Sequence, residues 1–190
     1  MYKNLFTHLW HVVRYPATIW NEATDSTDAQ KKHLTDFFYP LVGLASFAAF
    51  ISCFFDGDLT FKQQVTQGIQ HFIVSFVSLF GGLFLSAKLL DWSFVRWFAQ
   101  PSRFAKAELL IVYAQAPVLA VSVLTNLIPE LFFLKLLFLY VFAIVWEAAI
   151  NFYEIPPALQ GRFTLVAGAV ILISPQLIEI VLKLLLPGLK

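Results

Sequence analysis

The sequence predicts an all-α, polytopic membrane protein: one bundle of five transmembrane helices, preceded by an N-terminal amphipathic interfacial helix. Hydrophobic residues make up 59% of the 190-residue chain and charged residues only 13%. Three long stretches, residues 37–55, 63–87 and 109–129, contain no Asp, Glu, Lys or Arg. Each is long enough to cross the ~30 Å hydrocarbon core of a bilayer, which takes ~20 helical residues. The length suits a single domain, residues 1–190, without a second soluble domain.

Residues 1–35 are predicted to form a cytoplasmic and interfacial segment that begins with an amphipathic helix. At helical spacing, residues 2–14 separate into an apolar and a polar face. The apolar face would carry Tyr2, Leu5, Phe6, Leu9, Val12 and Val13. The polar face would carry Lys3, Asn4, Thr7, His8, His11 and Arg14. This division is typical of a helix in the membrane interface, and also of one packed on the rest of the protein; we favour the interface.

The first three spans are expected over residues 36–55, 70–90 and 108–128. Small side chains recur every four positions in the first two, a spacing that lets helices approach closely in lipid. They are Ala45, Ala49 and Cys53 in the first span and Ser78, Gly82 and Ser86 in the second. We expect such faces to pack against other helices, including those of other membrane proteins or of a second copy. The Trp- and Arg-rich connection at residues 91–106 is expected to lie along the interface.

The fourth and fifth spans are expected over residues 131–155 and 162–186, although charged residues interrupt both. Neither segment has the continuous polar face of a soluble surface helix. Glu179 and Lys183 stand four positions apart, in the order that favours an ion pair within a helix. Lys135 either extends toward the outer surface or meets Glu179. Four spans, with the last pair of segments re-entrant, are the alternative.

The distribution of positive charge predicts a cytoplasmic N-terminus and an outer C-terminus, because Lys and Arg gather on the cytoplasmic side of membrane proteins. With that orientation the inner segments hold Lys3, Arg14, Lys31, Lys32, Lys88, Arg96, Arg103, Lys106 and Arg162. The outer segments hold Lys62, Lys183 and Lys190. All five tryptophans map to the inner interface, where indole rings anchor helices: Trp10, Trp20, Trp92, Trp97 and Trp146.

Two short motifs resemble the Yip family of Ypt- or Rab-interacting membrane proteins. Pro16 and Trp20 are spaced as in the Pro-x-x-x-Trp entry of bacterial members. A second motif resembles the Asp-Leu-x-Gly-Pro-Leu segment that precedes the first span in this family, although Tyr39 replaces its glycine. The residues in register are Asp36, Pro40 and Leu41. With five spans and a short outer C-terminus, the resemblance extends over nearly the whole chain.

The resemblance implies a multi-pass protein of the bacterial inner membrane, because the segment before the first span is short as in prokaryotic members. Eukaryotic relatives are similar in span number but carry a longer cytosolic region and a link to Rab GTPases and vesicle traffic. The implied role is a non-enzymatic scaffold or adaptor that organises membrane partners or lipids.

Three polar residues near the inner end of the fourth span form the candidate site. Glu147, Asn151 and Glu154 are spaced by four and then three positions, which would place them on one helix face. An acid at the centre of a membrane helix costs ~2.5–3.5 kcal/mol, so this face is expected to turn inward. There it would meet Asp36, Glu108, Arg103 and Lys106. We favour a structural hydrogen-bond network over a site for a cation or a lipid headgroup, which converging carboxylates would also permit.

The chain contains no phosphate-binding glycine loop, HExxH motif or CxxC pair, so we expect no catalytic residue, cofactor or metal. The formal net charge of +1 argues against nucleic acid as a partner. Membrane lipids and other membrane proteins are the expected partners. The alternative function is a transporter of a small solute, an ion or a lipid, with a polar site between the helices. Gln115, Asn126, Glu147 and Asn151 would form that site, and Pro117 and Pro175 would break helices near it.

Overall fold

The computed structural model describes residues 2–22, 31–55, 57, 60–98 and 100–185. The side chains of Tyr2, Lys3 and Asn4, the end of the predicted fifth span and Lys190 lie outside the described residues. Every described element is a helix, and five are long and apolar enough to cross a membrane. They cover Lys31–Phe55, Phe61–Phe98, Phe104–Leu127, Pro129–Asn151 and Pro157–Leu185. The predicted all-α fold, with five such helices after a shorter N-terminal helix, is confirmed.

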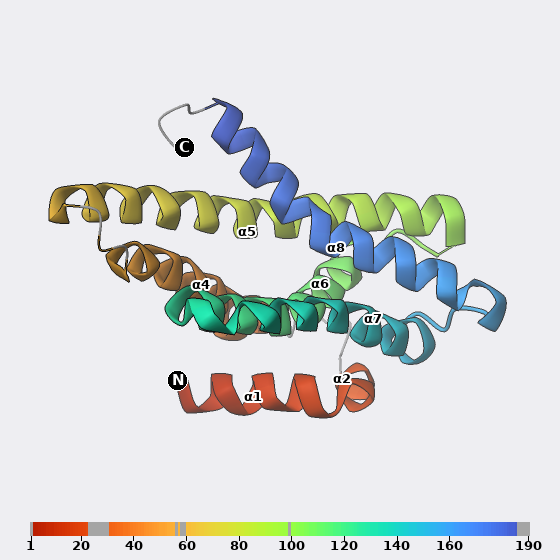
Figure 1. The fold of residues 1–190 in the computed structure, drawn as a ribbon. Helices are drawn as coiled ribbons and strands as arrows, with labels where there is room; N and C mark the ends of the chain where they lie inside the picture. Colours follow the sequence, from red (N-terminus) through yellow and green to blue (C-terminus); the bar gives the residue numbers. More distant parts are fainter. Residues whose placement is uncertain (1, 23–30, 56, 58–59, 99, 186–190) are drawn as a thin grey trace.

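Two short helices, α1 (Tyr2–Arg14) and α2 (Pro16–Glu22), precede the five spans (Figure 1). The first span combines η1 (Leu34–Phe38), α4 (Tyr39–Ser52) and η2 (Cys53–Phe55). The second and third are α5 (Phe61–Phe98) and α6 (Phe104–Leu127). The fourth combines η3 (Pro129–Leu139) with α7 (Tyr140–Asn151), and the fifth is α8 (Pro157–Leu185).

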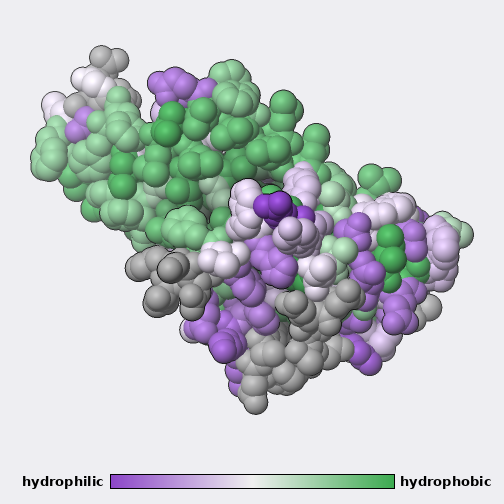
Figure 2. Space-filling view, turned by 90° about the horizontal axis from the view of Figure 1, so that it is seen from below, coloured by the Kyte–Doolittle hydropathy of each residue, from purple (hydrophilic) through white to green (hydrophobic). Residues whose placement is uncertain are grey.

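Successive spans cross the bundle in alternate directions, which gives it two ends. The proximal end carries α2, the connection from α5 to α6 and the connection from α7 to α8. The distal end carries the connection from α4 to α5, the connection from α6 to η3 and the C-terminal end of α8 (Figure 1). Figure 2 shows that hydrophobic residues gather over one half of the face seen from below and hydrophilic residues over the other.

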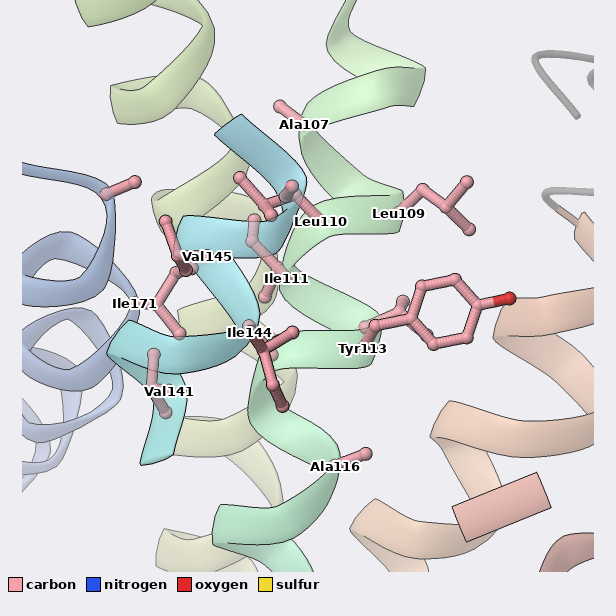
Figure 3. Packing of buried hydrophobic residues seen from close by; sticks show 14 of the residues in the cluster. Ala107, Leu109, Leu110, Ile111, Tyr113, Ala116, Val141, Ile144, Val145 and Ile171 are labelled. Atoms are coloured by element: carbon pink, nitrogen blue, oxygen red, sulfur yellow. The ribbon is translucent and has the colours of Figure 1, made fainter. Parts of the chain in front are cut away.

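The central helix is α6, which packs against each of the other spans and against α1. All of its residues from 107 to 117 are buried. Figure 3 shows Leu110 and Ile111 beside Ile144 and Val145 of α7, whereas Tyr113 points to the opposite side. There Tyr113 meets the N-terminal segment, with its ring centroid 5.4 Å from that of Trp20. The first half of α6 is therefore enclosed on all sides.

The first span begins with a π-helical turn, η1, which follows from Pro40. Proline has no backbone N–H and cannot donate to the carbonyl four residues before it, that of Asp36. The N–H of Tyr39 instead bonds to Leu34 O, five residues earlier, and widens the turn. The residues that resemble the family motif therefore build the entry of the first span.

Helix α5 has 38 residues and extends beyond the predicted second span at both ends. The connection after this span begins later than predicted, because residues 91–98 continue the helix. Its position along the interface stays a prediction. Phe94 and Phe98 are buried there, with ring centroids 4.5 and 5.3 Å from that of Phe163 in α8. No proline or glycine interrupts this stretch before Pro101, so nothing in the sequence ends the helix earlier.

The small-residue faces lie in contacts within the chain. A Cβ atom on Gly82 would lie 2.7 Å from Pro175 Cγ, so only glycine permits the observed approach of α5 to α8. One turn further, Ser86 is fully buried and its hydroxyl donates to Val170 O over 3.5 Å. Gly82 and Ser86 of this face therefore lie against α8, whereas Ser78, one turn earlier, lines a cavity that is described below.

The amphipathic helix α1 packs on the bundle with part of its apolar face and exposes the rest. Leu5 and Val12 are buried against the core, while Phe6 and Trp10 are 63% and 62% exposed. Packing on the rest of the protein, one of the two alternatives, is therefore observed for part of the helix, and contact of its exposed part with the membrane interface stays a prediction. Trp20, one of the five tryptophans expected at the inner interface, is buried between the rings of Tyr113 and Phe152, so its ring is not free to anchor the helix in lipid.

Candidate functional site

A cavity of about 590 Å³ lies in the distal half of the bundle, between α4, α5, α6, η3 and α8. We call it the distal cavity. Its volume falls within the range of ~300–1,000 Å³ that is usual for ligand pockets. Its wall combines apolar side chains with polar ones, the latter being Gln70, His71, Ser75, Ser78, Gln115, Ser122, Thr125, Asn126, Lys135, Gln176, Glu179 and Lys183.

The inner end of the distal cavity, its floor, is organised by Pro175 in α8. Because proline lacks an N–H, the carbonyl of Ile171 has no partner in the helical hydrogen-bond pattern. Gln115 of α6 supplies one: its side-chain Nε2 donates to Ile171 O over 3.1 Å. This bond explains why an amide side chain is only 3% exposed at the centre of a membrane bundle.

Two polar atoms at this floor have no hydrogen-bond partner among the described residues. They are Gln115 Oε1 and Ser78 Oγ, and both side chains are 3% exposed. The bond to Ile171 O requires the amide nitrogen on that side, so Oε1 is the free acceptor. A buried polar atom without a partner costs ~1–3 kcal/mol, which a ligand or water molecule beside it would recover.

The distal mouth of the cavity carries charge. The predicted ion pair is present, with Lys183 Nζ 2.7 Å from Glu179 Oε1, and both side chains are about half exposed. The alternative that Lys135 meets Glu179 is wrong, since Lys135 makes no ion pair with any residue that the structure describes. Two ammonium groups and one carboxylate therefore surround the opening.

The distal cavity does not continue to the proximal end. Its innermost wall includes Gln115 and Ile171, and the next layers of the bundle hold fully buried Leu83, Leu110 and Ile144. Glu147 is not among the lining residues. Of the polar residues assigned to a transport site, Gln115 and Asn126 line the cavity, and Glu147 and Asn151 do not.

The predicted carboxylate site at the proximal end is divided. Glu147 and Asn151 share a face of α7, as expected, with Asn151 Nδ2 donating to Glu147 Oε2 over 3.0 Å. Asn151 is exposed and Glu147 half-buried, so this pair lies at the surface of α7. Tyr140, two turns earlier on the same side, donates its hydroxyl to Val13 O at the end of α1.

The placement of Glu154 on this helix face is wrong. Helix α7 ends at Asn151, and Glu154 adopts a left-handed backbone conformation with φ of 52°. Pro156 and Pro157 follow after Ile155. Since proline has no N–H to donate and disfavours a helical conformation in the residue before it, α7 cannot continue through this segment.

Glu154 instead lines a smaller proximal pocket of about 260 Å³ with Arg103 and Lys106. Lys106 Nζ donates to Phe152 O and lies 4.3 Å from the centroid of the Phe152 ring. Glu154 therefore shares this pocket with two residues of the basic connection. The remaining candidates do not line this pocket: Asp36 is exposed in η1, Glu108 is 7% exposed in α6, and Glu147 lies on α7.

Sequence reasoning named several distal residues without assembling them into one site. One sequence signal for the distal cavity was available: a glutamine and a proline, Gln115 and Pro175, stand at matching depth in two spans. Ser78 and Lys135 were assigned to packing and to charge pairing, and only the fold brings them to the same cavity.

Comparison with known proteins identifies the family. The model of the Yip1 domain matches residues 10–182, which is most of the chain. No curated protein and no solved structure matches the chain. The matched region includes all five membrane-length helices apart from the last residues of α8. The chain therefore belongs to the Yip family of multi-pass membrane proteins.

Proposed function

We propose that this Yip-family protein is a non-enzymatic scaffold or adaptor that organises lipids and partner proteins in a bacterial inner membrane. The supporting observation is an exposed layer of aromatic and basic side chains at the proximal end. Trp92 and Trp97 are 58% and 43% exposed at the end of α5, and Trp10 is exposed on α1. Aromatic and arginine side chains are enriched where proteins contact partners and membrane interfaces.

Cation–π contacts hold this layer together. The guanidinium of Arg14 lies 5.9 Å from the centroid of the Trp10 ring, and that of Arg162 lies 6.0 Å from the Trp97 ring. Each pair joins a headgroup-binding charge to an interfacial ring, a combination suited to the anionic inner leaflet. Such a surface can bind lipids and proteins without any chemical step.

The proposed orientation has the proximal end in the cytoplasm and the distal end outside. Described basic residues at the proximal end outnumber those at the distal end, in agreement with the positive-inside rule. The test replaces Cys53 by Ala and introduces single cysteines by Gly57→Cys and Gly161→Cys. A membrane-impermeant thiol reagent should label position 57 in intact cells and position 161 only after permeabilisation. The reverse pattern, or labelling of both positions, would contradict the orientation.

The scaffold role is tested by photo-crosslinking in cells. A photoreactive amino acid at Trp97 should give protein adducts of discrete mass, identified by mass spectrometry. The control position is Leu165, which is 65% exposed on α8. The absence of protein adducts at Trp97, or the same adducts at Leu165, would contradict the scaffold role.

A second candidate function, transport, is favoured by the distal cavity and by Pro175 at its floor. A transporter must expose its site alternately to both sides of the membrane. In a Cys53→Ala background, Ser78→Cys in a transporter should react with impermeant reagent from the outside and, in inverted vesicles, from the inside. Reaction from the outside alone would rule out alternating access and leave a binding pocket.

A further inference from the structure

The distal cavity has different chemistry at its two ends. Its floor is polar but uncharged, with the free oxygens of Gln115 and Ser78. Its mouth carries Lys135, Lys183 and Glu179. A ligand that fills this space therefore contacts neutral acceptors at one end and cations at the other.

The mouth selects for negative charge. Glu179 is already paired with Lys183, whereas Lys135 makes no ion pair in the described part of the chain. Lys135 also stands among exposed apolar residues of η3, including Phe132 and Leu136, where an ammonium group is poorly solvated. A phosphate accepts strong, charge-assisted hydrogen bonds from ammonium groups such as these.

The floor selects for hydrogen-bond donors without charge. Gln115 Oε1 can only accept a hydrogen bond, and Ser78 Oγ can accept or donate one. A charged donor would be costly here, because the adjoining buried side chains, such as Leu119 and Ile171, are apolar. Hydroxyl groups meet both requirements.

We propose that the distal cavity binds a hydroxylated phosphate ester, with its phosphate at Lys135 and Lys183 and its hydroxyls toward Gln115 and Ser78. Two sources share this chemistry: the headgroup of phosphatidylglycerol and free glycerol phosphate. In the described residues, η3 and α8 both line the cavity without packing extensively against each other. Acyl chains can extend from the cavity into the bilayer between them. Ligand binding does not depend on the scaffold role, whose test uses the opposite end of the molecule.

The first measurement is binding to the full chain in zwitterionic detergent, by native mass spectrometry and by the shift of the melting temperature. The probes are phosphatidylglycerol, phosphatidylcholine, glycerol 3-phosphate and glycerol. Phosphatidylglycerol should be retained and should stabilise the protein, whereas phosphatidylcholine and glycerol should do neither. Comparable binding of glycerol 3-phosphate would identify the soluble source. Failure of both phosphate esters to bind, or equal binding of phosphatidylcholine, would overturn the proposal.

The Lys135→Met variant tests the anionic contact, because it removes the charge, keeps most of the length of the side chain and breaks no ion pair. We expect about tenfold weaker binding of the phosphate ester, the effect of one charge-assisted hydrogen bond. The control is Lys88→Met on α5, an exposed lysine that does not line the cavity. Unchanged binding by Lys135→Met, or an equal loss in Lys88→Met, would exclude a phosphate at the mouth.

The Ser78→Ala variant separates ligand binding from stability. Removal of an unpaired buried oxygen should raise the melting temperature of the empty protein. It should also weaken binding of the phosphate ester about threefold to tenfold. The control is Ser46→Ala, since Ser46 is fully buried but donates to Val42 O and does not line the cavity. It should leave binding unchanged. A Ser78→Ala variant with unaltered affinity would overturn the assignment of the floor.

Discussion

The two halves of α6 differ in what surrounds them. From Ala107 to Pro117 every side chain is buried against neighbouring helices, whereas from Val118 to Leu127 buried positions alternate with partly open ones along the distal cavity. The fourth span changes in the same way. Its α7 segment contributes buried Ile144 and Val145, and its η3 segment, a 3₁₀ helix, has no buried residue. One bundle thus contains a close-packed half and a loosely packed half.

The difference shows where this membrane protein obtains its stability. No hydrophobic effect drives helices together inside lipid, so close packing and satisfied backbone groups hold the bundle. The proximal half provides the packing. The distal half tolerates a cavity because Gln115 satisfies the carbonyl that Pro175 leaves free. Ligand chemistry is therefore possible in the half that contributes less to stability.

The largest expected effect comes from a matched pair of leucines in the two halves. Leu110→Ala removes a fully buried side chain from the packed half and should lower the free energy of unfolding by about 3 kcal/mol. Leu79→Ala, at the wall of the distal cavity, should lower it by only about 1 kcal/mol, because Leu79 is already partly open. Denaturant titration in mixed micelles gives both values. Equal losses of unfolding free energy in the two variants would contradict the difference in packing between the two halves.

The crossing of α5 and α8 joins the two halves and gives the next effect. Gly82→Ala places a methyl group 2.7 Å from Pro175 Cγ and 2.9 Å from Pro175 Cα. We expect a loss of about 1–3 kcal/mol from this overpacking. Gly43→Ala is the control: nothing lies within 4 Å of its added Cβ, so it should be neutral or stabilising by about 0.5–1 kcal/mol. A tolerated Gly82→Ala would mean that the crossing is looser than described.

A double-mutant cycle tests the polar contact at the floor of the distal cavity. Gln115→Leu should lower the free energy of unfolding by about 1–2 kcal/mol, because Ile171 O loses its hydrogen-bond donor. In a Pro175→Ala background the new backbone N–H can bond to Ile171 O. Gln115→Leu should then lower the free energy of unfolding much less. The expected coupling is about 1 kcal/mol, measured from the four unfolding free energies. Additive losses would show that Gln115 does not act through this carbonyl.

The smallest effect is expected at the proximal end. Glu154 has φ of 52°, a conformation that costs a non-glycine residue about 1 kcal/mol. Glu154→Gly should therefore raise the melting temperature slightly, with Glu154→Ala as the control that keeps the strain. If both variants melt alike, the turn stores no strain.

Charge-free length predicted the first three spans and hydropathy the other two, because the bilayer imposes both properties directly. Periodicity also predicted the face shared by Glu147 and Asn151 and the ion pair of Glu179 with Lys183. It predicted a close helix approach at the small residues of α5, which is observed where Gly82 meets Pro175. These are local properties of one helix or one face. Helix ends were less predictable: α7 ends at Asn151, well before Pro156, and Glu154 therefore lies in another pocket.

The distal cavity could not be predicted because it depends on contacts between distant segments. Gln115 has a partner only because α8 brings a proline-freed carbonyl beside it. Tryptophan is a residue type typical of interfacial anchors, yet the fold places Trp20 against Tyr113 and Phe152. Its burial depends on α2 packing on α7, which no pattern within residues 1–35 encodes.

The length of α5 has a consequence for the lipid around the protein. Its 38 residues span about 57 Å, nearly twice the ~30 Å hydrocarbon core. An upright α5 would project its glutamine-rich first turns and its tryptophan-rich last turns beyond the hydrocarbon, and a tilted one would draw them toward the headgroups. The helix can therefore meet bilayers of different thickness by changing its tilt. We expect hydrophobic mismatch to sort this protein weakly among membranes.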